Sequence, residues 1–181
     1  KHMATHAMID IETLGTKPNA VILSVGVIKF DPFTSNKPFN GKHWKIDVDA
    51  QTEIDREVNE DTLAWWSKQD PEIQEEAFGE TGRTNVTSFM KELNAWLTGC
   101  DSIWCQGPQF DMVILEDFFD SFNYHKNWFY WQVSDCRTLF KMMPQDPRKG
   151  LQQNLHNALE DSRWQAICVQ KFFKDFSVLP R

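Results

Sequence analysis

Residues 8–15, which read Met8-Ile9-Asp10-Ile11-Glu12-Thr13-Leu14-Gly15, decide the fold of this chain. Apolar and acidic residues alternate at the start of this stretch, which predicts a strand over about residues 4–11. Because residues two apart on a strand share a face, Asp10 and Glu12 are expected to point to the same side. The stretch therefore predicts a strand that presents two carboxylates together.

Two later segments carry related chemistry. Gln109-Phe110-Asp111-Met112 places Asp111 at the start of an apolar-periodic segment that predicts a helix. The other segment, residues 155–162, contains His156 and Asp161. Positions five apart on a helix differ by about 140°. We therefore expect His156 to precede the C-terminal helix and Asp161 to lie in its first turns.

Together these residues form a set suited to two-metal phosphodiester hydrolysis: Asp10, Glu12, Asp111, Asp161 and His156. Mg²⁺ prefers oxygen ligands and keeps several waters. Two ions about 4 Å apart can steady the attacking and the leaving oxygen of an in-line displacement. A neutral histidine, with a reference pKa near 6.5, can take the proton of the attacking water.

Each of these residues alone has an ordinary structural explanation. Asp10 and Glu12 could end a strand at the surface, and Asp111 could favour the dipole of a helix N-terminus. A lone His156 would usually be a hydrogen-bonded structural residue. The combination favours the catalytic interpretation, whereas Asp135 is better explained as a helix cap.

The same motifs resemble the DEDD exonuclease superfamily in its histidine-containing (DEDDh) branch, which includes proofreading exonucleases and RNase T. The resemblance rests on Asp10-Ile11-Glu12-Thr13, on Phe110-Asp111 and on His156 with Asp161, and it extends from about Ala4 to Phe173. Residues 62–69, Thr62-Leu63-Ala64-Trp65-Trp66-Ser67-Lys68-Gln69, also resemble a subgroup of bacteriophage exonucleases and a mycobacterial 3′–5′ exoribonuclease. One departure is Gly107, which stands where many relatives carry Asn.

The resemblance implies an α/β, RNase H-like fold and a 3′–5′ exonuclease that uses two Mg²⁺ or Mn²⁺ ions. Such an enzyme releases nucleoside 5′-monophosphates from single-stranded DNA or RNA ends, and we expect a slight preference for DNA. By resemblance, Asp10, Glu12 and Asp161 hold the first ion. Asp10 also bridges to the second ion, Asp111 assists there, and His156 deprotonates the water. The alternatives are an exoribonuclease or oligoribonuclease on the same fold, and a catalytically silent domain that binds nucleic acid or a partner.

Further residues are expected to contact the substrate: Thr13, Leu14, Trp66, Phe110, Arg148 and Lys149. Leu14 is expected against the terminal base, by resemblance. Trp65 and Trp66 point about 100° apart on a helix, so one can be core while the other lies at the groove or at a dimer contact. Four basic residues lie shortly before His156 and form either a phosphate-contacting edge or a solvated surface: Arg137, Lys141, Arg148 and Lys149. The loop over residues 144–150, which contains Arg148 and Lys149, is expected to close on the strand.

Composition limits the remaining possibilities. The chain has 181 residues, which fit one domain over residues 4–181, with Lys1–Met3 resembling a cloning remnant. A net charge of −7 argues against broad duplex binding but is compatible with recruitment of a single-stranded end by metal ions. Four cysteines without C-x-x-C spacing indicate free thiols in a reducing cytoplasm. No apolar run approaches a membrane span, and a homodimer is possible.

The periodicity along the chain predicts a mixed sheet with an antiparallel meander, flanked by helices. Strands are expected over residues 4–11, 20–30, 42–48, 102–106 and 128–133. Helices are expected after Asn59 or Asp61, from Pro71, over 86–97, from Asp111, over 135–142 and after His156.

Overall fold

A computed structural model describes residues 4–149 and 156–181. Its sheet has six strands in the order β4-β3-β2-β1-β5-β6. Strands β1, β2 and β3 form the antiparallel meander, and β5 and β6 continue the sheet parallel to β1. The mixed sheet predicted from sequence is therefore confirmed. The strands are β1 (His6–Thr13), β2 (Ile22–Phe30), β3 (Phe39–Ile46), β4 (Arg83–Thr84), β5 (Ser102–Cys105) and β6 (Val133–Asp135).

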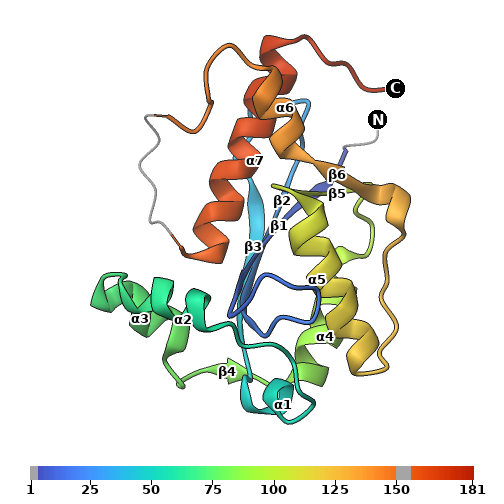
Figure 1. The fold of residues 1–181 in the computed structure, drawn as a ribbon. Coiled ribbons are helices and arrows are strands. Elements are labelled where there is room, and N and C mark those ends of the chain that lie inside the picture. The colour runs from blue at the N-terminus through green and yellow to red at the C-terminus, as the bar shows by residue number, and fades with distance from the viewer. Residues whose placement is uncertain (1–3, 150–155) are drawn as a thin grey trace.

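Helices cover both faces of this sheet (Figure 1). They are α1 (Asp49–Thr52), α2 (Glu60–Ser67), α3 (Pro71–Phe78), α4 (Val86–Leu97), α5 (Pro108–Ser121), α6 (Cys136–Met142) and α7 (Ala158–Asp175), with a 3₁₀ turn, η1 (Tyr130–Gln132). Ile9 and Ile11 of β1 enter a core with α4 and α5, whereas Met8 enters a second core with α6 and α7. Since side chains alternate along a strand, Asp10 and Glu12 share the face of Met8, toward α7.

Polar side chains cap the N-termini of three helices and set where these helices begin. Asn59, rather than Asp61, caps α2, because its side chain accepts a hydrogen bond from the backbone N–H of Thr62 at 3.0 Å. Asp135 caps α6, as predicted. Asn157 caps α7 by accepting from the N–H of Glu160, so His156 precedes the helix and Asp161 lies in its first turn.

Two predicted boundaries are wrong. The segment 128–133 is not a strand, because Tyr130–Gln132 forms a 3₁₀ turn and β6 begins only at Val133. The Gln132 side chain holds this turn by accepting from the N–H of Phe129 and donating to the carbonyl of Cys100. Helix α5 begins at Pro108, three residues before Asp111, since a proline suits the first helical turn. Among the described residues, no helix is long and apolar enough to cross a membrane.

Gly26 of β2 allows α7 to approach the sheet closely. A Cβ atom at this position would lie 2.2 Å from the backbone carbonyl carbon of Ala158 and 2.2 Å from the backbone nitrogen of Leu159. The first turn of α7 therefore rests directly on the backbone of β2. This contact fixes the height of Asp161 above the sheet.

We predict that Gly26→Ala lowers the free energy of unfolding by about 1–3 kcal/mol, because the added methyl group meets backbone that cannot rotate away. Gly41→Ala on β3 is the matched control. Its Cβ would meet a methyl group of Leu159 at 2.8 Å, and that side chain can turn aside. Urea unfolding of both variants measures the difference. Equal stability of the two variants would contradict the close contact.

Candidate active site

Four carboxylates meet where β1, α5 and α7 come together. Asp10 and Glu12 come from β1, Asp111 from the first turn of α5, and Asp161 from the first turn of α7. The backbone N–H of Ile11 donates to Asp111 Oδ2 at 3.3 Å, which ties α5 to β1. The structure thus brings together the acidic residues that the sequence singled out.

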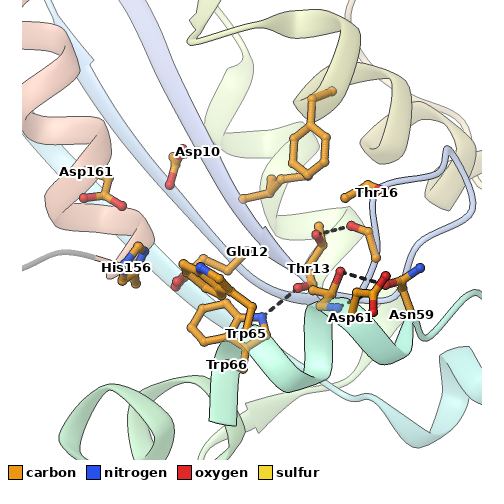
Figure 2. A pocket seen from close by; sticks show the side chains of 14 residues that line it. Asp10, Glu12, Thr13, Thr16, Asn59, Asp61, Trp65, Trp66, His156 and Asp161 are labelled. Atoms are coloured by element: carbon orange, nitrogen blue, oxygen red, sulfur yellow. Dashed lines mark hydrogen bonds between the residues drawn. The ribbon is translucent and has the colours of Figure 1, made fainter. Parts of the chain in front are cut away.

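A cavity of about 610 Å³ opens at this place. Figure 2 shows Asp10, Glu12, His156 and Asp161 on one side of it and Thr16, Asn59 and Asp61 on the other, with the two tryptophans of α2 near the acidic side. Phe110 and Thr13 also line the cavity, whereas Asp111 is buried behind it. Three of the four carboxylates line the cavity, and the fourth, that of Asp111, lies behind its wall.

Burial raises the pKa values of all four carboxylates. Burial raises the pKa of Asp10 well above its usual value, and the negative charges of Asp111, Asp161 and Glu12 add to the increase. Burial also raises the pKa of Asp111, although the N–H of Ile11 opposes the rise. The same cause raises the pKa of Glu12 to about 8 and that of Asp161 to about 6. Without a counter-ion the site therefore retains protons near neutral pH.

The oxygen atoms of this site fit a hard divalent cation. Ser24, directly opposite Glu12 in the β1–β2 register, donates to Glu12 Oε1 at 2.9 Å, while Oε2 is buried with no hydrogen-bond partner. An unpartnered buried carboxylate oxygen is a suitable metal ligand. Yet no three His, Cys, Asp or Glu side chains, in the part of the chain that the structure describes, stand close enough to form a ready-made metal site. Because like charges repel, the carboxylates would have to draw inward around a cation.

His156 stands at the edge of the cavity in an unusual backbone conformation. Its φ of 67° is left-handed, which is uncommon for a residue other than glycine and is often found at functional sites. Its imidazole lies edge-on to the Trp65 ring, with 4.7 Å between ring centroids. Burial lowers its pKa below 6.5, so the imidazole is neutral at pH 7 and able to accept a proton. The His156 backbone N–H also helps to hold the Asp161 carboxylate.

The two tryptophans of α2 both line the cavity but differ in exposure. Trp66 is 3% exposed and donates from Nε1 to the carbonyl of Thr13 at 3.0 Å, so it supports the cavity floor. Trp65 is 43% exposed and presents its ring to the cavity. The sequence showed that the two side chains must diverge, but only the placement of α2 decides which one is free.

Three other expected substrate contacts lie elsewhere. Leu14 packs against Val21 and Leu23 in a buried cluster and does not line the cavity. Arg148 forms a two-atom ion pair with Asp146 and lines a separate cavity. Lys149 is exposed. The loop closure expected over 144–150 involves residues 150–155, which lie outside the described residues.

Two supporting residues were missed from sequence. Ser24 holds Glu12, and Gln165 of α7 donates to Asp10 Oδ1 at 3.5 Å. Ser24 could have been found from the hairpin register, since residues opposite each other in an antiparallel pair are in contact. Gln165 follows Asp161 by four residues, so it occupies the same face of α7.

Comparison with known proteins identifies the relatives of this chain. A family model described as the 3′–5′ exoribonuclease Rv2179c-like domain matches residues 5–173. The chain belongs to this family. An exodeoxyribonuclease of enterobacteria phage T4 is 24% identical over 121 residues, which are 61% of this chain and 53% of that protein. The chain thus spans about half the length of that curated relative.

Solved structures share its fold. E. coli exonuclease I in a zinc-bound complex with single-stranded DNA superposes with a TM-score of 0.68 and 15% identity, over 97% of this chain and 41% of that one. The nuclease domain of 3′hExo, a DEDDh family member bound to rAMP, superposes with a TM-score of 0.65 and 13% identity, over 99% of this chain and 96% of that one. Cell-death related nuclease 4 superposes with a TM-score of 0.68 and 14% identity, over 96% of this chain and 64% of that one. These similarities confirm the RNase H-like fold.

We predict that the metal-free protein becomes less stable as pH rises from 7 to 9. A carboxyl group whose pKa is raised by folding stabilises the folded state below its unfolded pKa, and this contribution is lost as pH rises through the folded value. For Glu12 that value is about 8. Above pH 7 the histidines are largely neutral in both states, so they do not mask the trend.

Thermal unfolding in EDTA measures this effect, and each kcal/mol shifts the midpoint by about 2–4 °C in a domain of this size. Glu12→Gln should flatten the decline, and Mn²⁺ should reverse it in the wild type. Asp120→Asn, at an exposed position of α5, is the control and should behave as wild type. If the unfolding temperature of the wild type does not decrease from pH 7 to pH 9, ionisation of the carboxylates does not destabilise the folded protein.

Proposed function

We propose that this protein is a divalent-metal-dependent 3′–5′ exonuclease that releases nucleoside 5′-monophosphates from single-stranded ends. The observation that carries the proposal is the buried, oxygen-rich cluster of carboxylates from β1, α5 and α7, whose pKa values are raised chiefly by burial. Such a cluster has no structural use that a neutral core would not serve better. A catalytically silent binding domain is therefore disfavoured.

Asp10, Glu12 and Asp161 would hold the metal ions, Mg²⁺ or Mn²⁺, and Asp111 would assist from its buried position. Bound divalent ions would supply charge neutralisation at the scissile phosphate and favour deprotonation of the attacking water. Ser24 and Gln165 orient Glu12 and Asp10 by their hydrogen bonds. His156, neutral at pH 7, would accept the proton of the attacking water at the cavity edge.

The shape of the site supports a single-stranded substrate. The cavity is bounded by Trp65, Phe110 and His156, so a terminal nucleotide must leave its base stack to enter it. Base stacking on an exposed ring such as Trp65 contributes roughly 1–3 kcal/mol and tolerates any base. One structural neighbour agrees with this form of substrate, since E. coli exonuclease I forms complexes with single-stranded DNA and with a dT13 oligonucleotide.

RNA, rather than DNA, is the first candidate for the substrate. The family model describes an exoribonuclease and matches residues 5–173, which is nearly the whole chain. DNA, which we expected from sequence to be slightly favoured, is the second candidate because the phage T4 relative is an exodeoxyribonuclease.

The direct test compares degradation of matched single-stranded RNA and DNA, each with a free or a phosphate-blocked 3′ end, in Mg²⁺, Mn²⁺ or EDTA. We expect mononucleotides from free 3′ ends in either metal and no products in EDTA. Asp161→Asn should remove activity while the circular dichroism spectrum stays unchanged. Hydrolysis that persists in EDTA, or that proceeds equally from blocked ends, would refute the proposal.

A second prediction concerns the proposed base. His156→Ala should reduce kcat by roughly 10²- to 10⁴-fold with little change in metal affinity. Because burial lowers the pKa of His156, the wild-type rate should fall only as pH drops below about 6.5, where the imidazole becomes protonated. His43→Ala, at a partly buried histidine outside the cavity wall, is the control. If His156→Ala keeps most of the activity between pH 6 and 8, another group is the base.

A further inference from the structure

The active-site cavity contains no positive side chain to meet the rest of a nucleic acid strand. Neither Lys nor Arg is found among its lining residues in the described part of the chain. The whole protein carries a net charge of −7, so general attraction does not hold a strand either. Phosphates upstream of the scissile bond therefore need a local cation outside this cavity.

Two further cavities extend the active-site cavity. One of about 690 Å³ shares Phe110 with it and runs past Gly107 and Pro108 at the start of α5. Another of about 530 Å³ shares Gln106 and Arg137 with the second. Because they share wall residues, the three cavities are neighbours and form a row, the path, from the active-site cavity to α6.

Arg137 stands at the junction of the two outer cavities with its charge free. Its side chain is exposed, and its one side-chain hydrogen bond goes to the carbonyl of Gln106 at 3.4 Å. Over the residues that the structure describes, no carboxylate lies within ion-pair distance of it. The nearby Asp135 carboxylate is already used as a cap, accepting from Gly107 N, Arg137 N and the Thr138 hydroxyl. Most guanidinium donors of Arg137 therefore remain available.

Lys141 extends this positive charge along the path. It follows Arg137 by four residues on α6, so both project from one side of the helix, and it lines the outermost cavity. Arg148 lines the same cavity, but Asp146 binds it through two nitrogen atoms, so its charge is largely neutralised. Of the cations in that cavity wall, Arg137 and Lys141 are the ones free to meet a phosphate.

Gly107 has no side chain that would fill the path beside Arg137. Its φ of 92° is a conformation that favours glycine, and an added Cβ would lie 3.7 Å from the Arg137 guanidinium carbon. Without a side chain at this position, a strand can pass between Phe110 and Arg137.

We propose that Arg137, assisted by Lys141, binds the backbone phosphates that lie upstream of the scissile bond in a single-stranded substrate. The strand then leaves the active site over Phe110 and Gly107 and follows α6. This inference rests on the proposed exonuclease function. It implies that substrate length matters, because a dinucleotide has no phosphodiester beyond the scissile one and cannot reach Arg137.

The test combines binding and turnover. Binding is measured by fluorescence anisotropy with 5′-fluorescein octauridylate and octathymidylate, each protected by a terminal phosphorothioate, in Mg²⁺ at several KCl concentrations. Turnover is measured as kcat/KM for a dinucleotide and for the unprotected octamer. The variants are Arg137→Gln, Arg137→Lys and the charge-matched control Lys91→Gln, on the exposed side of α4.

Arg137→Gln should weaken octamer binding roughly two- to fivefold. It should also reduce the slope of log affinity against log salt by about 0.7, the value for one phosphate contact in a single strand. Arg137→Lys should restore the slope, and Lys91→Gln should match wild type. Turnover of the dinucleotide should not change.

Two results would overturn the inference. Unchanged octamer affinity and salt slope in Arg137→Gln would show that the strand takes another path. An equal loss on dinucleotide and octamer would show that Arg137 acts through the nearby Asp111 instead. Wild-type protein that binds the octamers but cleaves neither would refute the exonuclease function, while the salt slopes would still decide the role of Arg137.

Discussion

Burial of four carboxylates, those of Asp10, Glu12, Asp111 and Asp161, at one site is the constraint on which the rest of this structure depends. Placing four acidic groups in one partly buried site raises their pKa values and costs free energy of folding. The surrounding fold must therefore hold them together until a cation offsets this cost. A protein interior can do so only where rigid backbone positions each group independently.

Three separate pieces of backbone provide this rigidity. The parallel pair β1–β5 places the end of β1 beside the start of α5, and Ile11 bonds to Asp111 across that junction. Gly26 brings α7 down onto β2, which sets the position of Asp161. The register shift between Glu12 and Thr13 bends the end of β1 at the cavity, where irregular strand geometry is common in functional sites.

Much of this arrangement could be predicted from the sequence because it depends on local patterns. The alternation around Asp10 and Glu12 predicted both the strand and the shared face. The cap at Asp135 predicted the start of α6, and the spacing of His156 and Asp161 predicted that α7 begins after His156. The exoribonuclease family model matches residues 5–173, which agrees with the extent of the resemblance, from about Ala4 to Phe173.

The remaining features depend on packing between distant segments. The placement of α2 makes Trp66 part of the core and leaves Trp65 at the cavity, although the two residues are adjacent. The apolar run at 128–133 resembles a strand, yet the Gln132 side chain closes it into a turn. From sequence, Arg137 and Arg148 belong to one basic segment that is either a phosphate-contacting edge or a solvated surface. The structure separates the two residues, because Asp146 binds Arg148, whereas Arg137 has no carboxylate partner among the described residues.

Proton release on metal binding measures the central constraint most directly. Titration calorimetry with Mn²⁺ at pH 7, repeated in two buffers of different ionisation enthalpy, counts the protons that the protein loses. Because the pKa of Glu12 is about 8 in the metal-free protein, wild type should release about one proton or more per protein molecule, and Glu12→Gln should release fewer. Binding of Mn²⁺ with the same heat in both buffers, and therefore without proton release, would contradict a cluster of buried carboxylates with raised pKa values.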